Sequence, residues 1–256
     1  MGRLDGKVAL VTGASRGYGR AIAERLARDG ALVVVHFATN EEAANGTVSS
    51  IEAEGGAAFP LAAPLDGSPT GIDALFAKLD AALAARGRQA TVDILVNNAA
   101  ISPRGTVEDT SEALFDEVMD VDAKAPFFLL QKVLPRMPDG GRIINISSQT
   151  SLIAFPGVAA YTMAKGALDR LTLVAAKHLA PRDITVNAVL PGVADTDMNA
   201  SWLRGNPESF AAASVYSAFK RVADVTDIAD IVAFLASHDA RWITGQLIDG
   251  GGGSGI

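Results

Sequence analysis

The sequence predicts an α/β fold, a single doubly wound parallel sheet of about seven strands with helices on both faces. Short segments that are apolar throughout alternate with longer segments of helical character along the chain. Continuously apolar strands are typical of parallel sheets, because helices cover both of their faces. The sequence contains neither an internal repeat nor a Pro/Ser/Gly-rich linker, so we expect one domain over residues 1–256.

The predicted strands are short and mainly apolar or β-branched. Five of the seven have a Gly, Pro, Asn or Ser within two residues of their end, and these residues commonly open a turn. In chain order they are Val8–Val11, Leu32–Val35, Phe59–Leu61, Ile94–Val96, Arg142–Ile146, Ile184–Leu190 and Gln246–Ile248.

The segments between these strands are predicted as helices. Glycines at 30 and at 55–56 end the first two, and Pro126 is expected to interrupt the fourth, because proline removes a helical hydrogen bond. Right-handed connections between parallel strands then place helices on both faces of the sheet. The predicted helices are Gly19–Arg28, Glu41–Glu54, Ile72–Ala85, Leu114–Leu134, Tyr161–Leu179 and Ile228–Leu235.

The alternation stops between Pro191 and Lys220. This stretch carries Met198, Trp202, Phe210, Tyr216 and Phe219 among small and polar residues. Ligands of such sheets bind beyond the carboxyl ends of the strands, and long loops there are commonly functional. We therefore expect a substrate lid at about residues 193–220; the alternative is a surface helix pair that packs its aromatic residues inward.

Composition excludes several classes of protein. The chain has no cysteine, which rules out disulfides, thiolate nucleophiles and zinc–thiolate sites, and its three histidines make a multi-histidine metal site unexpected. A net charge of −7 argues against a nucleic-acid groove. The N-terminus lacks a signal-peptide layout, and no apolar run is long enough to span a bilayer. We expect a cytoplasmic protein that binds no metal, nucleic acid or membrane.

A glycine-rich loop follows the first predicted strand and opens the first predicted helix. It reads Thr12-Gly-Ala-Ser-Arg-Gly-Tyr-Gly19. Glycines allow a tight turn and a close approach of the backbone to a diphosphate, whose charge is attracted by the free N–H groups of the helix N-terminus. No Gly-Lys-Ser/Thr follows, which excludes a Walker loop. The loop therefore predicts a dinucleotide site.

The end of the second strand indicates which dinucleotide binds. An acidic residue there would bond the ribose 2′-hydroxyl and repel a 2′-phosphate. The chain has no acid after this strand before Glu41, and Arg16 of the glycine loop could reach a 2′-phosphate. We predict NADP(H) over NAD(H); the alternative for Arg16 is a solvated loop position.

Tyr161 and Lys165 stand four residues apart in a predicted helix, which places them on one face, one turn apart. A nearby ammonium favours the phenolate and lowers the pKa of tyrosine from its ordinary value of about 10. Ser148 lies at the end of a predicted strand thirteen residues upstream. Such a tyrosine can exchange a proton during a reaction.

Together these motifs resemble the short-chain dehydrogenase/reductase family over nearly the whole chain. The resemblance also includes Asn97-Asn-Ala-Ala100, Asn187-Ala-Val-Leu-Pro-Gly192 and Ile243-Thr-Gly-Gln246. It implies a Rossmann-type sheet and hydride transfer between a nicotinamide and a carbonyl or alcohol. Within the family, the chain resembles ketoreductases of the 3-oxoacyl-(acyl carrier protein) reductase type.

The resemblance also implies roles for individual residues. Tyr161 would be the general acid/base, Lys165 would lower its pKa and bind the nicotinamide ribose, and Ser148 would orient the substrate oxygen. We expect Asn97, Asn187 and Gln246 to tie strands and loops together. The implied cofactor contacts are Gly13, Ser15, Arg16, Gly17, Tyr18, Gly19, Phe37, Asp66, Asn98, Ala99, Tyr161, Lys165, Pro191, Gly192, Val193 and Thr196.

Asp122 departs from the family, which usually has asparagine there and uses its backbone carbonyl to hold a water leading from the lysine to solvent. Pro126, four residues later, has no N–H with which to bond that carbonyl. We expect the relay to survive through the backbone and the carboxylate to add negative charge near Lys165, or to be protonated. The alternative is that Asp122 merely replaces asparagine at a bend. Ala100 and Tyr18 also depart from the usual glycine and aliphatic residue.

The leading function is NADPH-dependent reduction of a ketone, such as a 3-oxoacyl thioester or a polyketide-like carbonyl, to a secondary alcohol. One alternative is an alcohol dehydrogenase acting in the oxidative direction. Another is a dinucleotide-binding regulatory protein without catalysis, against which the intact set of Ser148, Tyr161 and Lys165 speaks.

The resemblance implies a homodimer or homotetramer in addition to the small-molecule substrate. An acyl-carrier partner would need a local basic patch. Basic residues do occur on the two helices implied to form the main dimer contact, although ordinary solvated helix faces explain them equally well. They are Lys124, Lys132, Arg136, Arg170 and Lys177.

Overall fold

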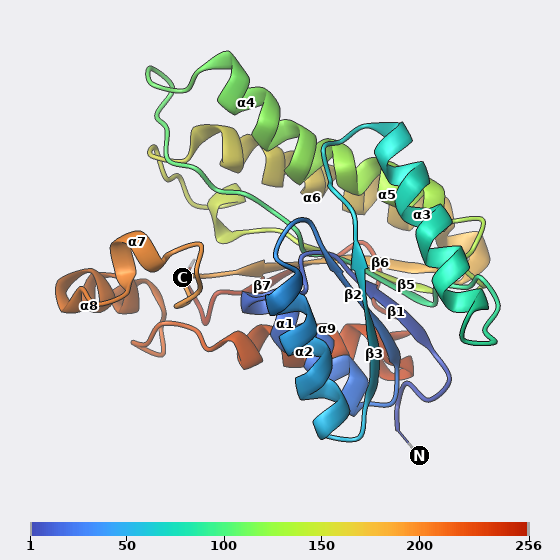
Figure 1. The fold of residues 1–256 in the computed structure, drawn as a ribbon. Coiled ribbons are helices and arrows are strands. Elements are labelled where there is room, and N and C mark those ends of the chain that lie inside the picture. Colours follow the sequence, from blue (N-terminus) through green and yellow to red (C-terminus); the bar gives the residue numbers. More distant parts are fainter. Residues whose placement is uncertain (1, 255–256) are drawn as a thin grey trace.

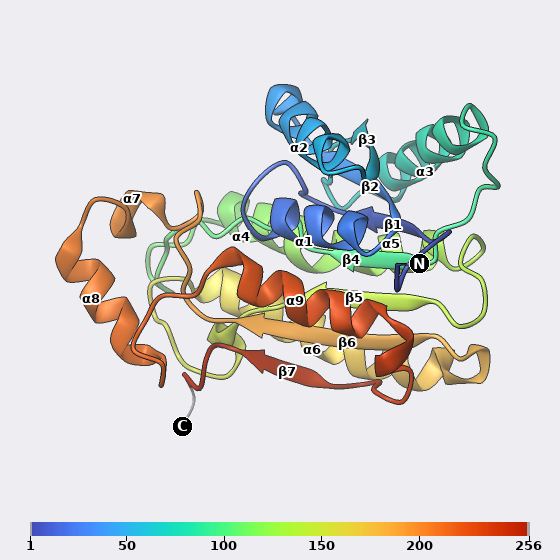
Figure 2. The same ribbon diagram turned by 90° about the horizontal axis from the view of Figure 1, so that it is seen from below.

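The computed structural model describes residues 2–254, and these contain a seven-stranded parallel sheet (Figures 1 and 2). The spatial order is β3-β2-β1-β4-β5-β6-β7. This arrangement confirms the predicted fold class. The strands are β1 (Val8–Val11), β2 (Leu32–Phe37), β3 (Ala57–Ala62), β4 (Ile94–Asn97), β5 (Arg142–Ile146), β6 (Thr185–Pro191) and β7 (Leu247–Gly250).

The strand order reverses direction next to β1. The chain first builds outward through β2 and β3, then returns to place β4 on the other side of β1, where Val11 is flanked by Val35 and Val96. The connections leaving β1 and β4 therefore diverge to opposite sides of the sheet. A crevice at the carboxyl ends of these two strands is the usual ligand site of such a sheet.

Helices cover both faces of the sheet, as Figure 1 shows. Helices α1 (Gly17–Arg28), α2 (Glu41–Ala53) and α9 (Val225–Ala236) pack on one face. Helices α3 (Pro69–Ala84), α5 (Ala125–Val133) and α6 (Ala159–Leu179) pack on the other. Successive side chains of a strand point to opposite faces, so most strands contribute to both hydrophobic cores. None of the helices within residues 2–254 combines the length and apolar character needed to cross a membrane.

The helical region predicted over Leu114–Leu134 is interrupted upstream of Pro126 rather than at it. Helix α4 (Glu112–Met119) runs into a π-helical turn at Asp120–Lys124, and α5 follows directly. Within the turn, the backbone N–H of Ala125 donates to the carbonyl of Asp120, five residues earlier. Pro126 then occupies the first turn of α5, where a missing N–H is tolerated. Single π-helical turns are frequent at functional sites.

The segment after β6 forms two short helices, α7 (Ala200–Leu203) and α8 (Pro207–Tyr216). Figure 2 shows them beyond the ends of the β6 and β7 arrows, away from the sheet. Leu203, Ala213 and Val222 form a small core within the segment. A helix pair is therefore present, but Phe210, Tyr216 and Phe219 are exposed rather than packed inward. The pair lies at the carboxyl end of the sheet, where a lid is expected.

Candidate functional site

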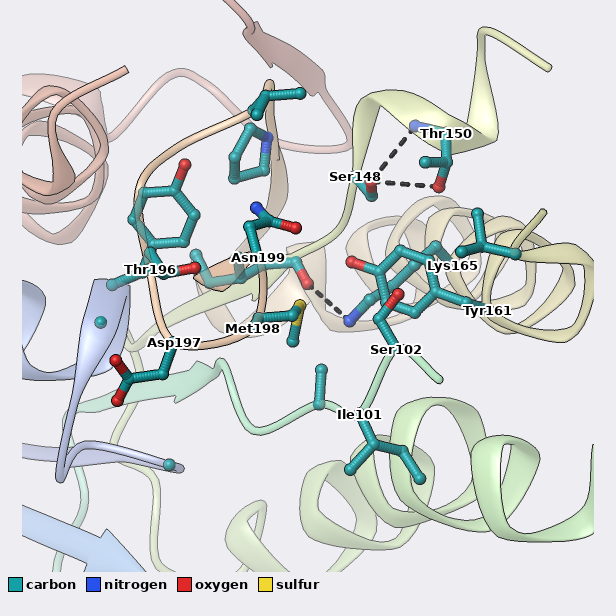
Figure 3. Close-up of a pocket in the computed structure, with 18 of the residues that line it drawn as sticks. Ile101, Ser102, Ser148, Thr150, Tyr161, Lys165, Thr196, Asp197, Met198 and Asn199 are labelled. Carbon is teal, nitrogen blue, oxygen red and sulfur yellow. Dashed lines mark hydrogen bonds between the residues drawn. The ribbon is translucent and has the colours of Figure 1, made fainter. Parts of the chain in front are cut away.

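A cavity of about 960 Å³ opens at the carboxyl ends of the strands. Its walls come from the glycine loop, from the residues that follow β2, β4, β5 and β6, and from α6, α7 and α8 (Figure 3). Of the residues predicted from sequence, two lie outside its lining, namely Asp66 and Asp122. The cavity brings together Gly13, Ser15, Arg16, Gly17, Tyr18, Gly19, Phe37, Asn98, Ala99, Ser148, Tyr161, Lys165, Pro191, Gly192, Val193 and Thr196.

The glycine loop has a shape that only glycine allows. Gly13 and Gly17 have positive φ angles of 63° and 54°. A Cβ at Gly19 would lie 2.2 Å from the carbonyl oxygen of Gly13. The residue that precedes α1, Arg16, makes no side-chain cap, so the first N–H groups of the helix are left to a ligand. This cradle fits the diphosphate of a dinucleotide.

His36 supports this loop from β2, a role the sequence analysis missed. It is buried, and its Nδ1 accepts a hydrogen bond from the backbone N–H of Gly13 at 3.2 Å. Its proton therefore sits on Nε2, which donates to the carbonyl of Ala63 at 3.0 Å. Burial lowers the pKa of His36 to about 4, so the ring is neutral at physiological pH. The only signal in the sequence is a polar residue inside an apolar strand.

Asn98 holds the same loop from the end of β4. Its Nδ2 donates to the carbonyls of Thr12 at 2.8 Å and Gly13 at 3.1 Å. In return, the Thr12 hydroxyl accepts from the backbone N–H groups of Asn98 and Ala99. The tight packing around Gly13 is thus fixed by hydrogen bonds to both neighbouring strands, β2 and β4.

Tyr18 closes the loop toward β6. Its hydroxyl donates to the backbone carbonyl of Gly192 at 3.5 Å. Burial raises the pKa of Tyr18, and the nearby Tyr161 raises it further. The phenol is therefore a fixed, neutral contact between the glycine loop and the loop after β6.

The cavity wall after β2 carries no acidic side chain. Phe37, Ala38, Thr39 and Asn40 line it, and Asn40 caps α2 by accepting from the backbone N–H of Ala43. Nothing in this wall would repel a 2′-phosphate.

Arg16 lies at the rim of the cavity with its side chain 69% exposed. It pairs with Asp197 of the segment after β6, at 3.6 Å, and Asp197 also accepts from Arg204 at 3.2 Å. The guanidinium is therefore held near the glycine loop by an exposed and weak ion pair. A bound phosphate could compete with the carboxylate for it.

Asp66 has a local structural contact instead of a place in the cavity. Its carboxylate accepts from the backbone N–H and the hydroxyl of Ser68, at 2.9 and 2.7 Å, and these bonds lower the pKa of Asp66. Ser68 in turn caps α3. The neighbouring Leu65 lines the cavity. The contact of Asp66 with the cofactor, which the family resemblance implies to be with its adenine, stays a prediction.

Tyr161 and Lys165 lie on the inward side of α6, as their spacing predicted, and both are buried. The Nζ of Lys165 is 5.4 Å from the centre of the Tyr161 ring. It donates to the carbonyl of Ile146, the last residue of β5, at 3.1 Å. Figure 3 shows Ser148, Tyr161 and Lys165 on one side of the cavity, facing Thr196, Asp197 and Met198 on the other.

The Ser148 hydroxyl is oriented by Thr150. Its Oγ accepts from the backbone N–H of Thr150 at 3.2 Å and from the Thr150 hydroxyl at 3.0 Å. A hydroxyl has two acceptor positions and a single proton. Because both acceptor positions are occupied, the proton of Ser148 is left for another acceptor.

The pKa of Tyr161 is raised, and the cause is its burial. Lys165 lowers the pKa, in the direction predicted from sequence, and so does the Ser148 hydroxyl, whereas the charge of Asp122 raises it. Burial outweighs Lys165. The phenol is therefore held in its protonated form, the form that can donate a proton.

Asp122 sits in the π-helical turn behind the cavity, fully buried. One carboxylate oxygen accepts from the backbone N–H of Ile101 at 2.9 Å, and the other lies 3.4 Å from the Nζ of Lys165. Burial raises the pKa of Asp122 more than Lys165 and the Ile101 N–H lower it. The carboxyl group expected near Lys165 is thus in direct contact with it, and its burial shifts it toward the protonated form.

The remaining amides join strands. Asn97 donates to Asn145 on the adjacent strand at 2.8 Å, and Asn145 donates to the Thr172 hydroxyl of α6 at 2.8 Å. Asn187 donates to the carbonyl of Ile243 and accepts from the backbone N–H of Gln246. These bonds fix the sheet beneath α6 and the approach to β7.

The far end of the cavity is lined by larger apolar and aromatic side chains. They include Ile153 and Phe155 from the segment before α6 and Met198, Trp202 and Tyr216 from the segment after β6. The rings of Phe155 and Tyr216 lie 5.8 Å apart. This end can hold a flat, apolar molecule beside Tyr161.

Comparison with known proteins gives consistent matches over the chain. A family model described as enoyl-(acyl carrier protein) reductase matches residues 13–254. Versicolorin reductase of Emericella nidulans is 40% identical over 98% of this chain and 97% of its own.

Two solved structures are also similar. The reductase LugOII, which catalyses keto-reduction at C1 in lugdunomycin biosynthesis, is 51% identical with a TM-score of 0.94, covering 99% of this chain and all of its own. The landomycin C-6 ketoreductase LanV with bound NADP and rabelomycin is 49% identical with a TM-score of 0.90, covering 99% and 98%.

Proposed function

We propose that this chain, which belongs to the short-chain dehydrogenase/reductase family, reduces a ketone of a polycyclic aromatic polyketide to a secondary alcohol with NADPH. The observation that carries the proposal is the set of Ser148, Tyr161 and Lys165 in one cavity with the glycine loop. Solved ketoreductases about half identical to the chain support the reaction class. The NADP and rabelomycin bound to LanV support the cofactor and the kind of substrate.

NADP(H) would be held along the carboxyl ends of the strands. The glycine loop and the N-terminus of α1 would bind its diphosphate, and Arg16 its 2′-phosphate. The segment Pro191–Thr196 would hold the nicotinamide, and Lys165 its ribose. When bound, the reduced nicotinamide supplies a hydride to the carbonyl carbon of the substrate.

Tyr161 would act as the general acid. Negative charge develops on the substrate oxygen during reduction, and a protonated phenol beside it can donate the required proton. The raised pKa of Tyr161 keeps this proton in place before the reaction. The buried setting strengthens the interaction, because little water screens it.

Ser148 would hold the same oxygen. Its two acceptor positions are taken by Thr150, so its proton points to a third partner, and we assign the substrate oxygen to that place. Two donors, one from Ser148 and one from Tyr161, would then converge on the developing charge, as in an oxyanion hole.

Lys165 would restore the proton that Tyr161 gives away, and Asp122 would position Lys165 for this transfer. The lysine is positioned by the Ile146 carbonyl and by the Asp122 carboxylate. We propose that Asp122 serves as a positioning and charge-setting residue for Lys165 rather than as a simple replacement for asparagine. The free backbone carbonyl of Asp122 expected from Pro126 remains part of this proposal.

The substrate class rests on the aromatic end of the cavity together with the similar ketoreductases. A 3-oxoacyl thioester is the second candidate, favoured by the similarity to a 3-oxoacyl-(acyl-carrier-protein) reductase of Staphylococcus aureus, which is 39% identical over 96% of this chain. Oxidation of an alcohol uses the same groups in reverse. We place reduction first, because a raised pKa favours the protonated phenol, which donates the proton that reduction consumes.

We also propose that residues 1–256 act as one catalytic domain with a lid at about 193–220, and that the chain forms a dimer or tetramer. Apolar side chains on α5 and α6 support self-association, since Phe127 is 48% and Val174 68% exposed. An acyl-carrier partner and a cytoplasmic location stay predictions.

The test is NADPH consumption on a panel that contains an angucyclinone ketone, 1-tetralone and an acetoacetyl thioester. We expect turnover of the aromatic ketones with a higher kcat/KM than the thioester. A higher kcat/KM for the thioester would instead support reduction of a 3-oxoacyl thioester. Absence of turnover in both directions, with NADPH bound, would favour the non-catalytic alternative.

A further inference from the structure

Three cations line the cavity, and one of them has no acidic partner within residues 2–254. Lys165 contacts Asp122, and Arg16 pairs with Asp197. Arg104 lines the cavity but forms no ion pair within the part of the chain that the structure describes. Its charge is therefore available to a ligand of the cavity.

Arg104 is placed by rigid backbone. The next residue, Gly105, donates its N–H to the carbonyl of Gly157 at 3.0 Å and accepts from the N–H of Ala159 at 3.1 Å. These bonds join the segment to the first turn of α6, two residues before Tyr161. Nη1 of Arg104 lies beside Gly157, because a Cβ placed on this glycine would be 3.7 Å from that nitrogen. The guanidinium thus has a fixed base near the reacting end of the cavity.

Across the cavity, Arg104 faces the segment after β6. Its guanidinium carbon lies 5.5 Å from the centre of the Trp202 ring on α7. The Trp202 indole N–H donates to Asn199, which orients the ring. A guanidinium beside an indole offers a flat apolar surface next to a planar fork of donors. Such a fork suits two neighbouring oxygens on one flat molecule.

We propose that Arg104 and Trp202 form a specificity site for an acidic oxygen pair, such as a hydroxyl conjugated to a quinone or ketone, on a flat polycyclic substrate. The proposal rests on the proposed function and names a feature of its substrate. Arg104 binds the ionised oxygens, and Trp202 covers the ring that carries them. The phosphate of a carrier-bound thioester arm is also negatively charged, but this arm has no flat ring. The neighbouring aromatic rings of Phe155 and Tyr216 also favour a ring-containing ligand.

Ligand binding at this site can be followed by fluorescence, because the chain has two tryptophans, Trp202 and Trp242. Trp242 is 95% exposed and can be replaced by phenylalanine at little structural cost. In Trp242→Phe protein with NADP⁺, Trp202 quenching is titrated with 2-hydroxy-1,4-naphthoquinone and with its 2-methoxy ether. The two probes share ring and size, and only the first carries an acidic hydroxyl.

We expect the hydroxy compound to bind at least about tenfold more tightly than the ether, as a charge-assisted hydrogen bond implies. Arg104→Gln should reduce this preference to about twofold or less, with Arg104→Lys intermediate because lysine lacks the planar fork. Arg241→Gln is the matched control, since Arg241 is exposed and its side chain donates to the His238 carbonyl, outside the cavity lining. It should keep the full preference.

Equal binding of the two probes by the parent, or a preference that survives Arg104→Gln, would overturn the proposal. A second result would also overturn it. If Arg104→Gln lowers kcat/KM for acetoacetyl-carrier protein but not for the acetoacetyl N-acetylcysteamine thioester, Arg104 binds the carrier phosphate. Turnover of 1-tetralone by the parent is measured separately. If the parent reduces 1-tetralone, the proposed ketone reduction stands even when the parent binds the two probes equally.

Discussion

The carboxylate of Asp122 lies 3.4 Å from the ammonium of Lys165, and both side chains are almost completely buried. A charge pair in such surroundings is weakly screened by water and salt. The π-helical turn brings Asp122 to this place, and its second oxygen is held by the backbone N–H of Ile101. Lys165 therefore has the Asp122 carboxyl group as a fixed neighbour, and Lys165 itself lies one turn of α6 away from Tyr161.

Replacing Asp122 with asparagine should change the pH dependence of ketone reduction. The negative charge of Asp122 raises the pKa of Tyr161. Without it, the phenol loses its proton at lower pH, so the alkaline fall in kcat/KM moves to lower pH. The measurement is kcat/KM against pH for both proteins. Asp120→Asn, which removes an exposed carboxylate of the same turn, is the control. Superimposable profiles of parent and Asp122→Asn would leave the carboxylate without a catalytic effect.

Ser148→Ala should lower kcat by about 100-fold or more while changing NADPH binding little, because one donor to the developing oxyanion is lost. Steady-state kinetics and NADPH titration measure the two quantities. Ser151→Ala is the matched control, since its hydroxyl donates to the backbone carbonyl of Ser148 and does not line the cavity. A kcat of Ser148→Ala close to that of the control would remove Ser148 from the reaction.

The preference for NADPH should depend on Arg16. Arg16→Gln should raise the KM for NADPH about tenfold, the usual effect of losing a charge-assisted hydrogen bond, and leave the KM for NADH nearly unchanged. Arg20→Gln, on the exposed side of α1 and paired with Glu24, serves as the control. Equal kcat/KM of the parent with NADH and NADPH would contradict the assignment of the cofactor.

His36 should make stability depend on pH. Its folded-state pKa of about 4 lies below the ordinary value of 6.5, so the unfolded chain takes up a proton first as pH falls. The free energy of unfolding should therefore be complete above pH 6.5 and decline toward pH 4, by about 3 kcal/mol in the limit. Urea unfolding of the parent, His36→Asn and the control His178→Asn measures this. A slope in His36→Asn equal to that of the parent would contradict the prediction.

The fold and most of the catalytic set could be predicted from the sequence, because local signals determine them. Apolar strands and the i, i+4 spacing of Tyr161 and Lys165 depend only on nearby residues. The position of the helix interruption could not be predicted in this way. Pro126 fits the first turn of a new helix, and the interruption is the π-helical turn that precedes it. His36 was missed because its partners, Gly13 and Ala63, are distant in sequence.

Two further features needed the three-dimensional surroundings. The net direction of the Tyr161 pKa depends on its burial, which the sequence does not report, whereas the effect of Lys165 could be inferred from spacing. The pairing of Arg104 with Trp202 joins residues from opposite walls of the cavity. Neither residue belongs to a recognisable motif, so only the folded chain brings them together.

The central claim, that the buried phenol of Tyr161 gives its proton to the substrate oxygen, is tested most directly by Tyr161→Phe. With NADPH and an aromatic ketone that the parent reduces, the variant should lose at least about 1,000-fold in single-turnover rate, within the range for general acid catalysis. Its dissociation constant for NADPH should stay within about threefold of the parent, because the phenylalanine ring fills the same space. A single-turnover rate within tenfold of the parent would contradict the claim.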